Sequence, residues 1–184
     1  IFVIALFSSL GLTPIIRRIA QRCDWLDVPL DERRLHSRPI PRLGGIAIYL
    51  TILISLAPLP LIDNLLTKAF WLSGAKVIGV LASATLVFLF GLYDDFKGSS
   101  ATLKFIALFV GATVLFFAGV SVSAISMPFV GSISLPPLVS YGLTVLWIVG
   151  ISNAFNLIDG MDGLAAGAGL FATLVMLVVS FVQG

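Results

Sequence analysis

Long apolar runs alternate with short polar segments along this chain, and the alternation predicts a helical membrane protein. A helix needs about 20 apolar residues to cross a bilayer. Six runs meet or approach that length, at residues 1–16, 43–62, 71–93, 105–122, 141–158 and 164–184. We therefore expect an all-α fold, a polytopic membrane helical bundle with about six transmembrane helices.

One connecting segment has a different pattern. Residues 121–140 are rich in Ser and Pro, and small residues alternate with apolar ones around Gly131. A period of two is typical of strands rather than helices. The segment therefore predicts a short hairpin at the membrane surface.

The composition supports a membrane protein. Hydrophobic residues make up 59% of the 184 residues and charged residues only 11%, whereas a soluble domain carries about 25% charged residues. The apolar runs are too continuous for the strands of a membrane barrel, which alternate over about 10 residues. Cys23 is the only cysteine, so no internal disulfide can form. The chain starts in an apolar run without Met, and we expect residues 1–184 to be a single transmembrane domain, truncated at both ends.

The basic residues orient the bundle. If the runs cross the membrane in turn, residues 17–42, 94–104 and 153–163 share one side and carry nine of the eleven Lys and Arg residues. The positive-inside rule makes this side cytoplasmic and the hairpin periplasmic. All the acidic residues except Asp63 fall on the same side. Charged, water-soluble substrates would therefore meet the protein at its cytoplasmic face.

Two adjacent aspartates, Asp94 and Asp95, stand in GLYDDFKG (91–98), where an apolar run ends. An ionised carboxylate at the edge of hydrocarbon is costly, which favours a functional role. Neighbouring helical residues point about 100° apart, so one carboxylate can face a metal or a reacting group while the other faces a basic partner. A solvated loop start beside Lys97 is the alternative for this pair taken alone.

A second polar cluster lies further along the chain. Four polar residues recur there at every third position: Asn153, Asn156, Asp159 and Asp162. Gly160 and Gly163 predict that the helix ends first, which leaves the aspartates on a Gly-rich turn with accessible backbone N–H groups. Asn amides can read a base or sugar, and carboxylates can hold Mg²⁺ through oxygen. The alternative is a set of polar residues that cap helices and hold them together.

The longest polar segment, residues 17–42, contains all seven arginines. The planar guanidinium group of arginine can donate two parallel hydrogen bonds to a phosphate, and a Gly-rich helix start offers backbone N–H groups to anions. The candidate phosphate-binding residues of this region, with two lysines near the aspartate pair, are His36, Arg38, Arg42, Gly44, Gly45, Lys97 and Lys104. Ordinary loop charge attracted to anionic lipid is the alternative for any one arginine, and interfacial snorkelling is the alternative for the lysines.

Together, PRLGG (41–45), GLYDDFKG (91–98) and NAFNLIDGMDGLAAG (153–167) resemble the motifs of the polyprenyl-phosphate N-acetylhexosamine-1-phosphate transferase family, glycosyltransferase family 4. RRLHSRPIPRLGG (33–45) is most similar to its WecA/TagO-like branch. The resemblance implies transfer of N-acetylglucosamine 1-phosphate from UDP-N-acetylglucosamine to undecaprenyl phosphate, with release of UMP. Such a reaction starts a cell-envelope glycan such as lipopolysaccharide or teichoic acid.

The resemblance also implies a cofactor, Mg²⁺ or Mn²⁺, a bacterial inner-membrane location and a homodimer. It implies about ten or eleven helices in the full protein, of which this chain would be the N-terminal part. The implied catalytic residues are Asp94, Asp95, Asp159 and Asp162, the first three of them also metal ligands. Asn156, Asp159, Gly160 and Asp162 would line the nucleotide and pyrophosphate pocket, and Asn153 would be a further substrate-binding residue. Later cytoplasmic loops of the family, with a further aspartate and a histidine-rich segment, are not in this sequence, so we expect an incomplete site.

Two other functions fit parts of the pattern. A muramyl-pentapeptide phosphotransferase would share the aspartates and differ in how it recognises the sugar. A transporter or channel would place charges within the spans, often beside broken helices, whereas these aspartates cluster at predicted helix ends. The residues leave direct attack by the lipid phosphate and a two-step route through an enzyme intermediate equally open.

Overall fold

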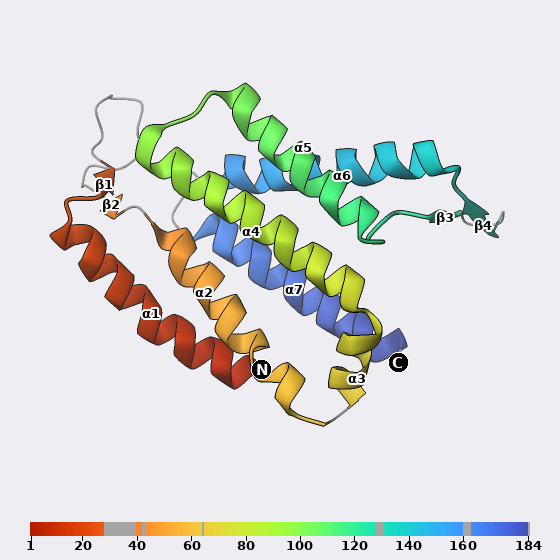
Figure 1. Ribbon diagram of the computed structural model, residues 1–184, viewed down its shortest axis with the longest axis horizontal. Coiled ribbons are helices and arrows are strands. Elements are labelled where there is room, and N and C mark those ends of the chain that lie inside the picture. The colour runs from red at the N-terminus through yellow and green to blue at the C-terminus, as the bar shows by residue number, and fades with distance from the viewer. Residues whose placement is uncertain (28–39, 42, 64, 128–130, 160–162, 184) are drawn as a thin grey trace.

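Helices account for most of the architecture in the computed structural model (Figure 1). The structure describes residues 1–27, 40–41, 43–63, 65–127, 131–159 and 163–183. The elements are α1 (Phe2–Arg22), β1 (Leu26–Asp27), β2 (Ile40–Pro41), α2 (Gly44–Leu56), the 3₁₀ helix η1 (Leu59–Leu61), α3 (Leu65–Leu72), α4 (Gly74–Lys97), α5 (Ala101–Phe117), β3 (Ala124–Met127), β4 (Gly131–Ser134), α6 (Pro137–Ile158) and α7 (Leu164–Gln183).

Five helical segments are long and apolar enough to cross a membrane, counted over the described residues. They are Phe2–Arg22, Gly44–Leu61, Gly74–Lys97, Pro137–Ile158 and Leu164–Val182, and α5 is a shorter apolar helix. The expected helical membrane bundle is therefore confirmed. Most large apolar side chains lie on the surface, as suits helices that face lipid rather than water.

Several helix boundaries differ from the sequence expectation. α1 continues through Pro14 to Arg22, because transmembrane helices tolerate proline where neighbouring groups satisfy the backbone. The second run divides into α2 and η1 near Pro58, which lacks an N–H to continue the ladder. The polar connection expected at 63–70 contains most of the short helix α3.

The fourth run is shorter than expected, since α5 ends at Phe117 rather than near Val122. Gly119, with φ +89°, turns the chain out of the helix there. The hairpin predicted in the Ser- and Pro-rich segment is confirmed: β3 and β4 pair antiparallel, with Ile125 opposite Ile133.

Small residues let α4 and α5 approach closely. Gly79 lies against Ala118, and Gly111 lies against Ser83 and Val87. The hydroxyl of Ser83 donates a hydrogen bond to the carbonyl oxygen of Gly111 at 2.9 Å. Small residues and interhelical hydrogen bonds of this kind hold membrane helices together, because apolar burial adds little between helices already in lipid.

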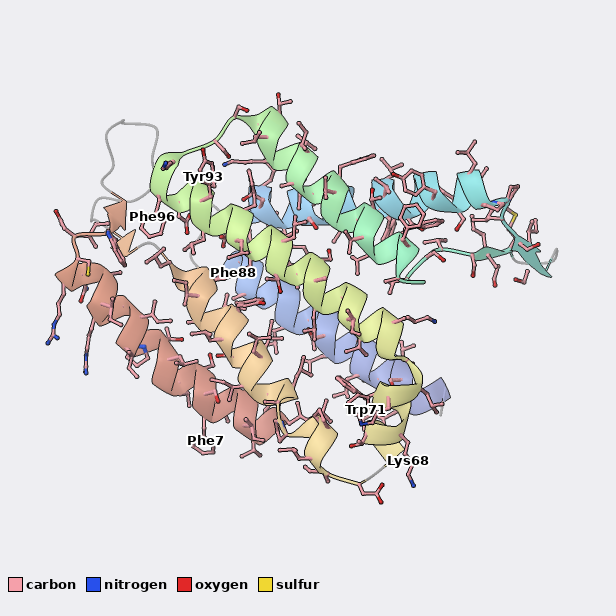
Figure 2. All side chains as sticks on the ribbon, in the orientation of Figure 1. Phe7, Lys68, Trp71, Phe88, Tyr93 and Phe96 are labelled. Carbon is pink, nitrogen blue, oxygen red and sulfur yellow. The ribbon has the colours of Figure 1, made fainter. Side chains whose placement is uncertain are left out.

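α2 packs between α1 and α4. Tyr49 of α2 stacks on Phe88 of α4, with ring centroids 4.2 Å apart, and its hydroxyl lies 2.6 Å from the Oγ1 atom of Thr85. Figure 2 shows Phe88 midway along α4, with Tyr93 and Phe96 nearer its C-terminal end. These contacts join the middle of α4 to the first half of α2.

Candidate functional site

The last turn of α4 carries the aspartate pair, which the sequence placed at the start of a loop. The helix continues through both aspartates to Lys97, and Gly98, with φ +70°, then breaks it. Ser100 caps α5, since its side chain accepts a hydrogen bond from the Leu103 N–H at 3.3 Å. Only residues 98–100 separate the two helices, so the first turn of α5 is held beside the last turn of α4.

Asp94 is paired across this turn. Its Oδ2 atom lies 2.8 Å from Lys104 Nζ, and its Oδ1 atom accepts a hydrogen bond from the Ser99 hydroxyl at 2.5 Å. Both side chains of the ion pair remain partly exposed, so water and a substrate can reach them. The pair gives a fixed position to one carboxylate and one ammonium at the end of the bundle.

Asp95 faces a different surface. A cavity of about 130 Å³ is lined by Asp24, Trp25, Leu26, Leu43, Asp95 and Phe96. Trp25, just after α1, packs edge-to-face on Phe96 with ring centroids 5.2 Å apart. The two adjacent carboxylates therefore serve different environments, as their separation around the helix predicts.

The same cavity adjoins the start of α2. Leu43, just before α2, has a left-handed backbone with φ +74°. Its carbonyl oxygen accepts a hydrogen bond from the Ile46 N–H at 3.0 Å. Gly44 and Gly45 follow, and a Cβ atom added at either would have no other atom within 4 Å. Nearby, β1 pairs with β2, with Leu26 opposite Pro41. Two stretches of the arginine-rich segment 17–42, residues 26–27 and 40–41, therefore meet beside α4. His36, Arg38 and Arg42 lie outside the described residues.

The second acidic motif lies at the same end of the bundle. α6 ends at Ile158, so Asp159 is the first residue beyond the helix, and Gly163, with φ +77°, leads into α7. This confirms that the helix ends before the aspartates. Asn153 is partly buried on the last turns of α6, whereas Asn156 and Asp159 are exposed. Gly160 and Asp162 lie outside the described residues.

Figure 1 shows how the two motifs are brought to one end. The C-terminal ends of α4 and α6 and the starting ends of α2, α5 and α7 all lie toward the upper left. The helices run alternately toward and away from this end, with α6 crossing α5 rather than lying antiparallel to it. This arrangement brings Asp94, Asp95, Asp159, Lys104 and the Gly-rich start of α2 to one end of the bundle.

The two lysines differ in their partners. Lys104 pairs with Asp94, whereas the Lys97 ammonium lies 5.9 Å from the centre of the Tyr93 ring, one turn back on α4. A cation over an aromatic face is weakly held at an exposed site. Lys97 can therefore leave the ring for an anion at little cost.

The donor set suits a hard cation that shares its ligands with a substrate. In the described part of the chain, no three Asp, Glu, His or Cys side chains gather into a metal-binding group. Mg²⁺ commonly takes one or two carboxylates and completes its shell with water and substrate phosphates. Asp94, Asp95 and Asp159 supply carboxylate oxygens of that kind at one end of the bundle.

Sequence reasoning missed Ser99, Trp25 and Phe96. A hydroxyl residue two positions past the end of α4, close in sequence to the aspartate pair, was a signal for Ser99. The contact between Trp25 and Phe96 joins segments far apart in the chain, so no local sequence pattern predicts it.

Comparisons with known proteins agree with these motifs. Residues 77–184 match the family described as glycosyl transferase family 4. A probable undecaprenyl-phosphate N-acetylglucosaminyl 1-phosphate transferase of Bacillus subtilis (strain 168) is 32% identical over 183 residues, which cover 100% of this chain and 48% of that protein. A decaprenyl-phosphate N-acetylglucosaminephosphotransferase of Mycobacterium leprae is 36% identical over 173 residues, with 91% of this chain and 42% of that protein covered.

A third relative carries a different name. A phospho-N-acetylmuramoyl-pentapeptide-transferase of Chlamydia muridarum is 35% identical over 174 residues, with 84% of this chain and 49% of that protein covered. The chain thus spans about half the length of the curated relatives it matches. No solved structure shows significant similarity to it.

Proposed function

This chain belongs to glycosyl transferase family 4, and from that premise we propose that its protein transfers N-acetylglucosamine 1-phosphate from UDP-N-acetylglucosamine to undecaprenyl phosphate. One observation carries the proposal: Asp94, Asp95 and Asp159 lie at one end of a membrane bundle, where Asp94 pairs with Lys104. A lipid phosphate and a nucleotide sugar can meet only at such a boundary. The names of the Bacillus and Mycobacterium relatives supply the sugar and the polyprenyl acceptor.

The reaction exchanges one phosphoanhydride bond for another. An oxygen of the lipid phosphate bonds to the β-phosphorus of the nucleotide sugar, and the bond from that phosphorus to the bridging oxygen breaks. UMP leaves with the electron pair, and the product is the lipid-linked sugar diphosphate. Because both reactants are anions, catalysis depends on positioning and on positive charge near the phosphates.

Lys104 and Asp94 fit these needs as a unit. An ammonium has three donors, so Lys104 can keep its 2.8 Å contact to Asp94 while it binds a phosphate oxygen. The carboxylate then holds the lysine in place, and Ser99 holds the carboxylate. Asp95, on the other side of the helix turn, would align the lipid phosphate or accept its proton.

The metal and the nucleotide draw on the remaining residues. Mg²⁺, or Mn²⁺, would bind one or two carboxylates from among Asp94, Asp95 and Asp159 together with phosphate oxygens, and would supply charge neutralisation to the pyrophosphate. Asn153 and Asn156 would read the uridine or the sugar through their amides. The Gly-rich start of α2, with Gly44 and Gly45 exposed, would offer N–H groups to a phosphate.

The setting of the reaction is part of the proposal. The end surface with both acidic motifs would face the cytoplasm of a bacterium, since it carries most of the basic residues. The enzyme would work in the inner membrane as a homodimer and start a cell-envelope glycan. Transfer of phospho-muramyl-pentapeptide from its UDP derivative to undecaprenyl phosphate is the second candidate, favoured by the similarity to the Chlamydia relative.

UMP release tests both candidates. The full-length protein in detergent, with Mg²⁺ and undecaprenyl phosphate, would be offered UDP-N-acetylglucosamine and UDP-muramyl-pentapeptide in parallel. Lipid-dependent release from the first substrate alone supports the proposal. Release from the second alone assigns the second candidate, and release from neither refutes both.

A further inference from the structure

The β3–β4 hairpin has two chemically different faces. Its register places Ile125 opposite Ile133 and Met127 opposite Gly131, and directly opposed residues project to the same face while successive residues alternate. One face, here called the apolar face, consists of Ile125, Met127 and Ile133. The other, here called the serine face, consists of Ala124, Ser126, Ser132 and Ser134.

The apolar face is uncovered in the described structure. Ile125, Met127 and Ile133 are 37%, 47% and 43% exposed, and all described residues of both strands are exposed. Figure 1 shows the hairpin extending away from the helices, beyond the ends of α5 and α6. An isolated two-stranded hairpin is marginally stable in water, so this apolar face needs a surface to bury against.

The base of the hairpin is fixed to α6. The Ser140 hydroxyl donates to the Val122 carbonyl oxygen at 2.8 Å, and the Val122 N–H donates to the Thr144 hydroxyl oxygen at 2.9 Å. The Leu135 N–H donates a hydrogen bond to the Ser123 carbonyl oxygen at 2.9 Å. This bond joins the two chain segments at the base of the hairpin, just before β3 and just after β4. The level of the hairpin relative to the membrane is therefore set by the first two turns of α6.

The hairpin lies at the end of the bundle away from Asp94 and Asp95. β3 follows the end of α5 that lies away from Asp94, and β4 leads into the start of α6. The flanking residues Phe117 and Leu138 are large, apolar and exposed, so apolar side chains are also exposed on both helices next to the hairpin. Residues 105–158 contain no Asp, Glu, Lys, Arg or His.

We propose that the apolar face of the β3–β4 hairpin lies on the bilayer surface, with Ile125, Met127 and Ile133 among the lipid head groups and the serine face toward water. Segments with one apolar and one polar face bind the interface through the area they bury. Since the hairpin lacks charge, its binding does not require anionic lipid or low salt.

Neighbouring residues on opposite faces provide the test. In a Cys23→Ser background of the full-length protein, spin labels are attached at Ile133→Cys and Ser132→Cys, and as a second pair at Ile125→Cys and Ser126→Cys. The labelled proteins are reconstituted in phosphatidylcholine vesicles with and without phosphatidylglycerol. Relaxation of each label by oxygen, which concentrates in lipid, and by a water-soluble nickel chelate measures its surroundings.

The expected result is a several-fold higher ratio of oxygen to nickel accessibility at the isoleucine positions than at the serine positions, unchanged by phosphatidylglycerol. Equal nickel accessibility on both faces would mean that the hairpin stands free in water. Protection of the isoleucine positions from both reagents would mean that protein covers the apolar face, either a second copy or another part of the chain. Either result overturns the proposal, and retained UMP release shows that each labelled protein is folded.

Discussion

The close approach of α4 and α5 makes Gly79→Ala a sharp test of the packing. A Cβ atom added at Gly79 would lie 2.0 Å from the Cβ atom of Ala118 and 3.5 Å from its Cα atom. A methyl group attached to the backbone cannot rotate away, so the helices themselves must separate. Restoring an ordinary carbon contact of about 3.5–4.0 Å requires a shift of about 1.5–2 Å at this point.

The size of the effect follows from two destabilising contributions and one stabilising contribution. Overpacking costs about 1–3 kcal/mol, and a backbone shift of this size belongs at the upper end. The separation also strains the hydrogen bond between Ser83 and Gly111, one turn away, and such bonds contribute about 0.6 kcal/mol in membranes. Alanine gains about 1 kcal/mol over glycine in a helix interior. We therefore expect Gly79→Ala to lower the free energy of unfolding by about 2 kcal/mol.

Titration with sodium dodecyl sulfate in mixed micelles, followed by circular dichroism, measures this free energy for the full-length protein. Gly91→Ala is the matched control in the same helix, because nothing lies within 4 Å of its added Cβ atom, and it should be neutral or slightly stabilising. Ala118→Gly combined with Gly79→Ala removes the clash and should recover most of the loss. Equal stability of the Gly79 and Gly91 variants would refute the close approach.

The remaining predictions concern activity in the UMP-release assay. Replacing any one of the four motif aspartates, Asp94, Asp95, Asp159 or Asp162, with Asn should reduce transfer at least about 100-fold in a protein that still folds. Asp63→Asn, at the other end of the bundle, should leave transfer unchanged. Normal activity in all four motif variants would refute the site. Lys104→Met should lower kcat/KM by about 10²-fold or more, and Lys104→Arg should recover part of it; full activity in the Met variant would remove Lys104 from phosphate binding. Trp25→Ala should lower kcat through the misplaced end of α4, and Trp25→Phe should retain most activity because it keeps an aromatic contact; equal loss in both would contradict a packing role. Chelation of divalent ions should abolish turnover and added Mg²⁺ restore it, and turnover that persists in chelator would exclude the metal.

Hydropathy located the helices but not all of their ends. The apolar run stops at Tyr93, whereas α4 continues to Lys97, because charged residues are compatible with helical hydrogen bonding even where they leave the hydrocarbon. The break comes at Gly98, whose positive φ suits glycine alone. In contrast, Gly160 and Gly163 correctly indicated that α6 ends before Asp159.

The candidate site was predictable in its residues more than in its contacts. Asp94, Asp95 and Lys104 stood out by charge at the edge of apolar runs, yet the sequence could not tell which aspartate pairs with the lysine. That choice depends on the direction of each side chain from the last turn of α4, and the short turn through Ser99 decides it. The cavity beside Asp95 depends on the packing of Trp25 on Phe96, a contact between distant segments.

The short connection between α4 and α5 also bears on the order in which the protein is assembled. Asp94 and Lys104 are ten positions apart, and Ser83 and Gly111 are 28 apart, so both contacts close short loops at small entropic cost. Membrane helices associate after each has inserted, and these two emerge from the ribosome in succession. The ion pair of the site can therefore form as soon as α5 is inserted, before α6 and α7 have inserted, and the later helices then dock against a preformed ion pair.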